Sequence, residues 1–171
     1  MDQLSVKDEF KKQPISILFV CLGNICRSPS ADGIMHHLVE KEGSQDLIKI
    51  DSAGTYGGHT GALPDARMRQ HAAKRGYELT HRSRKVRTQD FEDFDLIIAM
   101  DDNNFEDLQL YAPSSEARKK IHRMTDYLQK IQIDHVPDPY YQGADGFEKV
   151  LDILEDACAG LLQSIRKGIT I

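Results

Sequence analysis

Residues 15–29 read Ile-Ser-Ile-Leu-Phe-Val-Cys-Leu-Gly-Asn-Ile-Cys-Arg-Ser-Pro, and this stretch decides the fold. Its first part, Ile15 to Val20, is a nearly continuous apolar run, which is typical of a strand buried on both faces of a sheet. Pro29 stands where the first turn of a helix tolerates proline, and Ser28 is a candidate cap for that helix. The stretch therefore predicts a strand, a tight loop and a helix N-terminus in direct succession.

The rest of the chain alternates between apolar runs and helix-like segments. We expect further strands at 47–51, 95–100 and 119–124. We expect helices at 29–43, 65–75, 102–110 and 147–165, the last with Cys158 on its apolar face. This alternation predicts an α/β fold in which helices cover both faces of a parallel sheet. In such sheets ligands bind at the carboxyl ends of the strands, which is where Cys21 lies.

The composition is typical of one globular domain. The chain has 171 residues, of which 40% are hydrophobic, and a net charge of −5 argues against a general nucleic-acid binder. No apolar run is long enough to span a membrane, and residues 1–14 lack the apolar core of a secretory signal. We therefore expect a flexible extension at 1–14, a single domain at 15–171 and no membrane partner. Three cysteines are too few for a disulfide framework, which favours the cytoplasm.

The loop after the first strand combines residue types that bind and attack a phosphate group. A helix N-terminus and a neighbouring cation favour the thiolate form of a cysteine, and Cys21 is expected to have both. Arg27 offers a planar fork that matches two phosphate oxygens. Gly23 and Asn24 tolerate the positive φ that turns backbone amides toward an oxyanion. We expect phosphoryl transfer to sulfur, followed by hydrolysis of the cysteinyl-phosphate.

Phosphoryl transfer of this kind also needs an acid to protonate the departing oxygen. The segment at 136–141 reads Val-Pro-Asp-Pro-Tyr-Tyr and offers Asp138 for that role. The two flanking prolines stiffen the segment and hold its backbone extended. Together with the Cys21 loop, Asp138 is the candidate general acid.

These two segments closely resemble those of the low-molecular-weight protein tyrosine phosphatases. Three shorter landmarks follow the family's order: Ser52-Ala53-Gly54-Thr55, His81-Arg82-Ser83 and Ala99-Met100-Asp101. The resemblance runs from Ile15 to the C-terminus and implies a three-layer sandwich with a central four-stranded parallel sheet. It also implies hydrolysis of phosphotyrosine in proteins and of small aryl phosphates, without a metal or cofactor. Inorganic phosphate or another oxyanion would bind the same loop.

The resemblance also assigns roles to individual residues. It implies that Cys21 is the nucleophile, that Arg27 clamps the phosphate and the transition state, and that Asp138 is first acid and then base. The implied phosphate-binding loop consists of Leu22, Gly23, Asn24, Ile25, Cys26, Arg27 and Ser28. The residues that organise this loop would be Asn24, Ser28 and His81. Tyr140 and Tyr141 would form the aromatic wall beside the substrate ring.

Two positions leave a choice open. Cys26 matches the family's second loop cysteine, which is either a redox partner of Cys21 or a small packing residue. Gly58 stands where many family members carry a bulky aromatic residue. Either Tyr56 swings in to replace that ring, or the cleft is more open and less selective.

Other activities on a similar fold are kept as alternatives. A protein arginine phosphatase usually has threonine where this chain has Ile25. A thiol-dependent arsenate reductase needs two further cysteines, in relatives near 81–92, where this chain has none. We expect no metal ligand set, since His36 and His37 are adjacent and cannot chelate one ion from the same helix face. The expected partners are phosphotyrosine proteins, and the expected state is a monomer or weak dimer.

Overall fold

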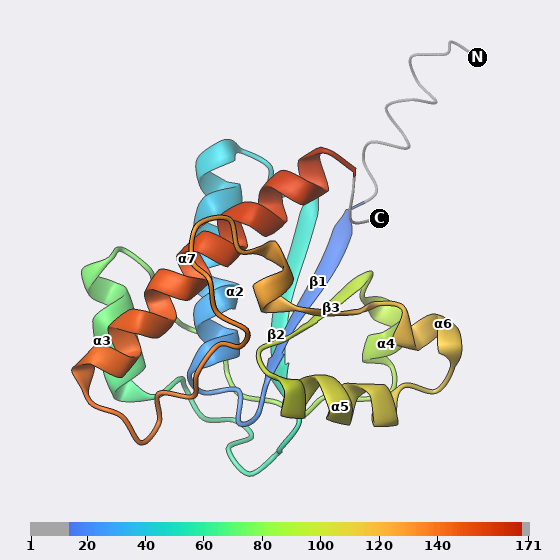
Figure 1. Cartoon of the computed structure of the whole chain (residues 1–171), viewed down its shortest axis with the longest axis horizontal. Coiled ribbons are helices and arrows are strands. Elements are labelled where there is room, and N and C mark those ends of the chain that lie inside the picture. Colours follow the sequence, from blue (N-terminus) through green and yellow to red (C-terminus); the bar gives the residue numbers. More distant parts are fainter. Residues whose placement is uncertain (1–13, 169–171) are drawn as a thin grey trace.

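The computed structural model describes residues 14–168, and it confirms a four-stranded parallel sheet at the centre of the molecule (Figure 1). The strand order is β2-β1-β3-β4, with every pair parallel. The bounds are β1 (Ile15–Cys21), β2 (Ile48–Gly54), β3 (Leu96–Ala99) and β4 (Ile121–Arg123). The last two strands are shorter than the predicted 95–100 and 119–124. Strand β1 is central, so its carboxyl end meets residues from both sides.

Helices cover both faces of this sheet, as the sequence predicts. The helical segments are α2 (Arg27–Glu42), α3 (Ala66–Lys74), α4 (Asp90–Asp93), α5 (Asp102–Tyr111), α6 (Ser115–Arg118), η1 (Met124–Tyr127) and α7 (Ala144–Arg166). Figure 1 shows α2, α3 and α7 on one side and α4, α5 and α6 on the other. The result is a three-layer α/β sandwich.

Alternating side chains of β1 supply two separate cores. Ile17 and Phe19 pack with α2 and α7, whereas Leu18 and Val20 pack with residues of β3 and α5. All four side chains are completely buried. This explains why the strand reads as a continuous apolar run rather than an alternating one. The two cores fix β1, and with it the position of Cys21 at its carboxyl end.

The start of α2 differs from the expectation. The helix begins at Arg27 with Cys26 at the N-cap, and no side chain caps it. Ser28 is therefore not the cap, because it lies inside the first turn and its hydroxyl serves the loop instead. The predicted end is confirmed, since Gly43 takes a left-handed conformation with φ of 73°.

The expected N-terminal extension at 1–14 lies outside the described residues except for Pro14. Within 14–168, no helix combines the length and the apolar character that crossing a membrane requires.

Candidate active site

The loop between β1 and α2 turns its carbonyl groups outward. Three of them accept hydrogen bonds from groups outside the loop: Leu22 from the Tyr56 amide (2.8 Å), Gly23 from the Ser83 hydroxyl (3.0 Å) and Ile25 from the Asp65 amide (2.8 Å). The N–H of a trans peptide points away from the preceding C=O. The amides of Gly23, Asn24 and Cys26 therefore face the interior of the loop. Converging amides of this kind form an anion-binding concavity.

Asn24 organises this loop from within. It is the one non-glycine residue among 14–168 with positive φ, at 57°. Its amide nitrogen donates to the hydroxyls of Ser28 (2.7 Å) and Ser52 (3.0 Å). Its amide oxygen accepts from the Arg84 backbone amide and lies 3.1 Å from His81 Nε2. The predicted set of Asn24, Ser28 and His81 is thus brought together, with Ser52 and Arg84 as partners that the sequence did not reveal.

One glycine of the loop and one beside it allow neighbouring groups to pack closely against the loop. Gly23 does not take the positive φ that the sequence suggested. Instead, a Cβ there would lie only 3.1 Å from the His59 ring. Gly54 faces Cys21 in the β1–β2 register, and a Cβ on it would lie 2.6 Å from the carbonyl oxygen of Leu22. No larger residue fits at Gly54 without moving the loop backbone.

Cys21 lies at the base of this loop. Its side chain is almost fully buried, and its sulfur is 3.0 Å from the Ser28 hydroxyl. Because the Asn24 amide donates to the same hydroxyl, the hydroxyl hydrogen is free to point toward sulfur. The arrangement stabilises negative charge on the Cys21 sulfur.

Arg27 is buried and held from two sides. One guanidinium nitrogen donates to Asp101 at 2.6 Å and to the Val136 carbonyl at 3.0 Å. Burial alone would lower the pKa of Arg27, but neighbouring Cys21 and the hydrogen bond to Asp101 raise it above its ordinary value. In the sequence, Asp101 appears only as the last residue of the landmark Ala99-Met100-Asp101, without an assigned role. Its position at the carboxyl end of β3, on the same sheet edge as Cys21, is the signal that could have found it.

Asp138 faces the same guanidinium from the opposite loop. Its carboxylate lies 3.7 Å from the second nitrogen of Arg27 and also accepts the Tyr140 amide at 3.1 Å. Its side chain is 43% exposed, so its carboxyl group can reach a bound ligand and exchange a proton with it. The structure thus brings Cys21, Arg27 and Asp138 together.

A pocket of about 320 Å³ opens above these three residues. It is also lined by Leu22, Gly23, Ile25, Cys26, Tyr56, His59, Tyr140 and Tyr141. The Tyr140 and Tyr141 rings meet edge to face with centroids 4.9 Å apart. Tyr56 fills the space beside Gly58, since a Cβ on Gly58 would lie 2.2 Å from the Tyr56 ring. Tyr56 therefore lines the pocket together with Tyr140 and Tyr141.

The other two cysteines are free and buried. Burial raises the pKa of the Cys26 thiol, and the charges of Asp65 and Cys21 raise it further. Cys158 is completely buried on α7, as predicted, and burial likewise raises its pKa. Both thiols stay protonated at neutral pH, so Cys21 is the one cysteine placed to act as a nucleophile.

The fold and the pocket define a class of protein: an α/β sandwich with a loop of inward-facing amides around a cysteine at the carboxyl end of a parallel sheet. Comparison with known proteins gives the family. Residues 16–170 match the family model of the low molecular weight phosphotyrosine protein phosphatases. A Synechocystis sp. protein assigned to this family is 46% identical over 155 residues, which are 91% of this chain and 99% of that protein. The chain belongs to the low molecular weight phosphotyrosine protein phosphatase family.

Solved structures agree with this assignment. A protein tyrosine phosphatase from Entamoeba histolytica, crystallised with Hepes in its active site, superposes with a TM-score of 0.88 at 43% identity. The match covers 90% of this chain and 98% of that one. The arginine phosphatase of Drosophila also superposes, with a TM-score of 0.82, 36% identity and coverage of 88% and 97%. The fold therefore carries both activities, and the pocket must decide between them.

Proposed function

We propose that this protein hydrolyses phosphotyrosine in protein substrates without a metal ion. The observation that carries the proposal is that Cys21, Arg27 and Asp138 line one pocket walled by tyrosine rings. In the first step the sulfur of Cys21 bonds to phosphorus as the phosphorus–oxygen bond to tyrosine breaks. Asp138 gives its proton to the departing oxygen. In the second step water attacks phosphorus, Asp138 takes its proton, and sulfur leaves with inorganic phosphate as product.

The loop supplies the stabilisation that this transfer needs. Phosphoryl transfer spreads charge over the equatorial oxygens, so catalysis depends on positioning and on electrostatic contacts. The inward amides of Gly23, Asn24 and Cys26 and the fixed charge of Arg27 provide those contacts. Because Asp101 and the Val136 carbonyl already hold Arg27, little reorganisation is required when phosphate binds.

The walls of the pocket favour an aromatic ester. The Cys21 side chain is almost fully buried, and Tyr56, Tyr140 and Tyr141 line the same pocket. Facing aromatic walls bind a flat ring by stacking and by edge contacts. A phenyl ring also keeps the peptide backbone of the substrate outside the pocket.

A protein arginine phosphatase is the second candidate, since the Drosophila enzyme shares the fold. Ile25 and the pair of tyrosines at 140 and 141 favour the tyrosine ester over the phosphorus–nitrogen bond of phosphoarginine. Arsenate reduction has less support, because the chain has only three cysteines and Cys158 is buried in α7. That reaction needs two further accessible thiols beyond the nucleophile.

We further propose a cytoplasmic location and reversible oxidation of the site. Three free thiols suit a reducing compartment. A peroxide would oxidise the Cys21 thiolate to a sulfenic acid and release water or alcohol. The Cys26 thiol would then form the disulfide and release water.

The test compares purified protein on phosphotyrosine, phosphoserine and phosphoarginine peptides in the presence of a chelator. We expect turnover on the first peptide, none for Cys21→Ser, and a fall in kcat of about 100-fold or more for Asp138→Ala. Cys158→Ser is the matched control, because it removes a thiol remote from the pocket. Preferred turnover of phosphoarginine, or full activity in Cys21→Ser, would contradict the proposal.

A further inference from the structure

The segment that carries Asp138 has few attachments to the rest of the protein. Its start is fixed, because the Val136 amide donates to the Met100 carbonyl at 2.8 Å. Between this anchor and α7, among the residues that the structure describes, the backbone makes one hydrogen bond to a distant part of the chain. The donor is Arg67, in the first turn of α3, and the acceptor is the Tyr140 carbonyl at 3.0 Å.

Arg67 is itself fixed relative to the phosphate-binding loop. Its guanidinium donates twice to the Asp65 carboxylate, at 3.1 Å from Nε and 2.9 Å from Nη2. Such a two-pronged contact sets the orientation of the arginine as well as its distance. The Asp65 backbone amide in turn donates to the Ile25 carbonyl of the loop at 2.8 Å. The position of the Arg67 guanidinium therefore follows the position of the loop.

Two aromatic rings pack against the same guanidinium. Its central carbon lies 4.8 Å from the ring centroid of Phe147 and 5.5 Å from that of Tyr140. A cation over the face of an aromatic ring is attracted to it. Phe147 is buried in the first turn of α7, and Figure 1 shows α3 beside the start of that helix. Arg67 therefore links α3 to Tyr140 and to the start of α7.

The residue that Arg67 holds is also the one that orients Asp138. The Tyr140 amide donates to Asp138 Oδ1 at 3.1 Å, while the Tyr140 carbonyl accepts from Arg67. The other contact of the Asp138 carboxylate, with Arg27 at 3.7 Å, is longer than a hydrogen bond. A shift of Tyr140 would therefore carry the Asp138 carboxylate with it.

We propose that Arg67 is a positioning residue, which sets the distance between Asp138 and a phosphate group bound beside Cys21. Arg67 does not line the pocket, so it acts through Tyr140 rather than on the substrate. A general acid must lie within hydrogen-bond reach of the departing oxygen, and a misplacement of about 1 Å can cost about 100-fold in rate. The inference rests on the proposed function, because it requires Asp138 to be the proton donor.

The experiment compares two esters that differ in their need for an acid. The tyrosine oxygen of a phosphotyrosine peptide must be protonated as it leaves, whereas the phenolate of a dinitrophenyl phosphate leaves without a proton. The kcat/KM value reports the step that breaks the phosphorus–oxygen bond. For Arg67→Gln we expect kcat/KM to fall about tenfold on the peptide and less than about twofold on the dinitrophenyl ester.

Arg69→Gln is the matched control for this variant. It also removes a cation from α3 together with a hydrogen bond to a backbone carbonyl, that of Pro64 at 3.0 Å. Since this bond does not involve the Asp138 segment, kcat/KM should stay at the parental value on both esters.

A double variant separates positioning from a general loss of structure. In an Asp138→Ala background there is no acid to position, so Arg67→Gln should lower kcat/KM on the peptide by less than about twofold further. A repeated fall of about tenfold in that background would overturn the inference, as would an equal loss on both esters in the single variant.

Two further outcomes are also decisive. If Arg67→Gln fails to fold by circular dichroism, Arg67→Lys is judged by the same ratio of the two esters, because lysine keeps the charge but not the planar fork. If the parent hydrolyses neither ester, the proposed function fails and this inference fails with it. If the parent hydrolyses both and the ratio is unchanged in the variant, this inference alone is wrong.

Discussion

The Ser28 hydroxyl lies 3.0 Å from the Cys21 sulfur while it accepts a hydrogen bond from the Asn24 amide at 2.7 Å. The Ala53 carbonyl is the other acceptor within reach, at 3.3 Å. A thiolate is a stronger acceptor than a neutral carbonyl, so the hydroxyl hydrogen turns to sulfur once Cys21 ionises. The buried amide of Asn24 thereby supports the charge on the nucleophile through one intermediate group.

Removal of this hydroxyl should slow both steps that involve charged sulfur. For Ser28→Ala we expect kcat to fall about ten- to hundredfold, since a hydrogen bond to a charged group contributes about 1.5–3 kcal/mol. Alkylation of Cys21 by iodoacetamide at neutral pH should slow in parallel. Ser30→Ala is the control, because its hydroxyl bonds to the Cys26 carbonyl and not to sulfur. Alkylation of Ser28→Ala at the parental rate would contradict this role.

Asp101 should control the position of Arg27. Asp101→Asn keeps only one of the two oxygens that now serve the Arg27 guanidinium (Oδ2) and the cap of α5 (Oδ1), and it removes the charge. We expect kcat to fall about tenfold, by analogy with the loss of about one charge-assisted hydrogen bond. KM should change little, because the added net positive charge offsets the looser fit. Asp102→Asn is the matched control, since that side chain pairs with Arg123 at the surface. An equal loss of kcat in both variants would exclude a specific role.

The fold could be predicted because its signals are local. The run of apolar residues in β1, the glycine that ends α2 and the periodicity of α7 each act within one element. The structure confirms these elements, although α7 begins at Ala144 rather than at 147. The cap of α2 was the exception. Ser28 matches the usual residue type, but the buried sulfur and Asn24 compete for its hydroxyl more strongly than the helix amides do.

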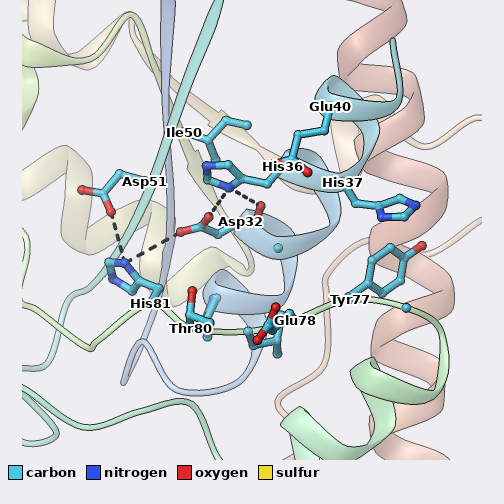
Figure 2. Close-up of a pocket in the computed structure, with 14 residues that line it drawn as sticks. Asp32, His36, His37, Glu40, Ile50, Asp51, Tyr77, Glu78, Thr80 and His81 are labelled. Atoms are coloured by element: carbon cyan, nitrogen blue, oxygen red, sulfur yellow. Dashed lines mark hydrogen bonds and ion pairs between the residues drawn. The ribbon is translucent and has the colours of Figure 1, made fainter. Parts of the chain in front are cut away.

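The site was predictable where its residues form contiguous motifs, and His81 could be added only through the family resemblance. The Cys21 loop and the Asp138 segment each form one contiguous motif, and the family resemblance predicted that the two would meet. The groups that hold these two motifs in place do not form a contiguous motif. Ser52, Arg84 and Asp101 come from three separate segments, and their contacts depend on strand order and register, which the sequence does not specify. The same is true of the contacts of His81 with Asp32 and Asp51 (Figure 2).

Gly58 and Tyr56 should act as a pair that sets the width of the cleft. A Cβ at Gly58 would lie 2.2 Å from the Tyr56 ring, so Gly58→Ala must move that ring. Because the ring is the exposed end of a side chain, we expect the fold to persist. KM for an aryl phosphate should rise severalfold, with kcat nearly unchanged, since the contact is with the substrate ring and not the phosphate.

Gly57→Ala is the matched control for this prediction. A Cβ at Gly57 would meet Lys85 at 3.4 Å, which is an ordinary contact. Tyr56→Ala should reproduce the rise in KM, and Tyr56→Ala combined with Gly58→Ala should add nothing further. An additive double variant would show that Gly58 acts by another route.

Asp65, which lies beside the pocket, should make the free energy of unfolding depend on pH. Its carboxylate caps α3 and pairs with Arg67, which in turn donates to the Tyr140 carbonyl at 3.0 Å. The hydrogen bond from Arg67 lowers the pKa of Asp65 below its ordinary value. In the unfolded chain the pKa of an aspartate is about 3.9, and above that pH the lowered pKa of Asp65 stabilises the folded protein. This stabilisation is lost as the pH falls through the pKa of Asp65 in the folded protein.

Asp65→Asn tests this directly, because asparagine keeps the helix cap but not the charge. The variant should melt below the parent at pH 7, and the difference should shrink below about pH 4 and vanish once Asp65 is protonated in the parent. Asp46→Asn is the control, since within residues 14–168 that exposed carboxylate has no hydrogen-bond or ion-pair partner. A difference between parent and Asp65→Asn that stays constant from pH 7 to acid would show that the cap geometry, and not the charge on Asp65, stabilises α3.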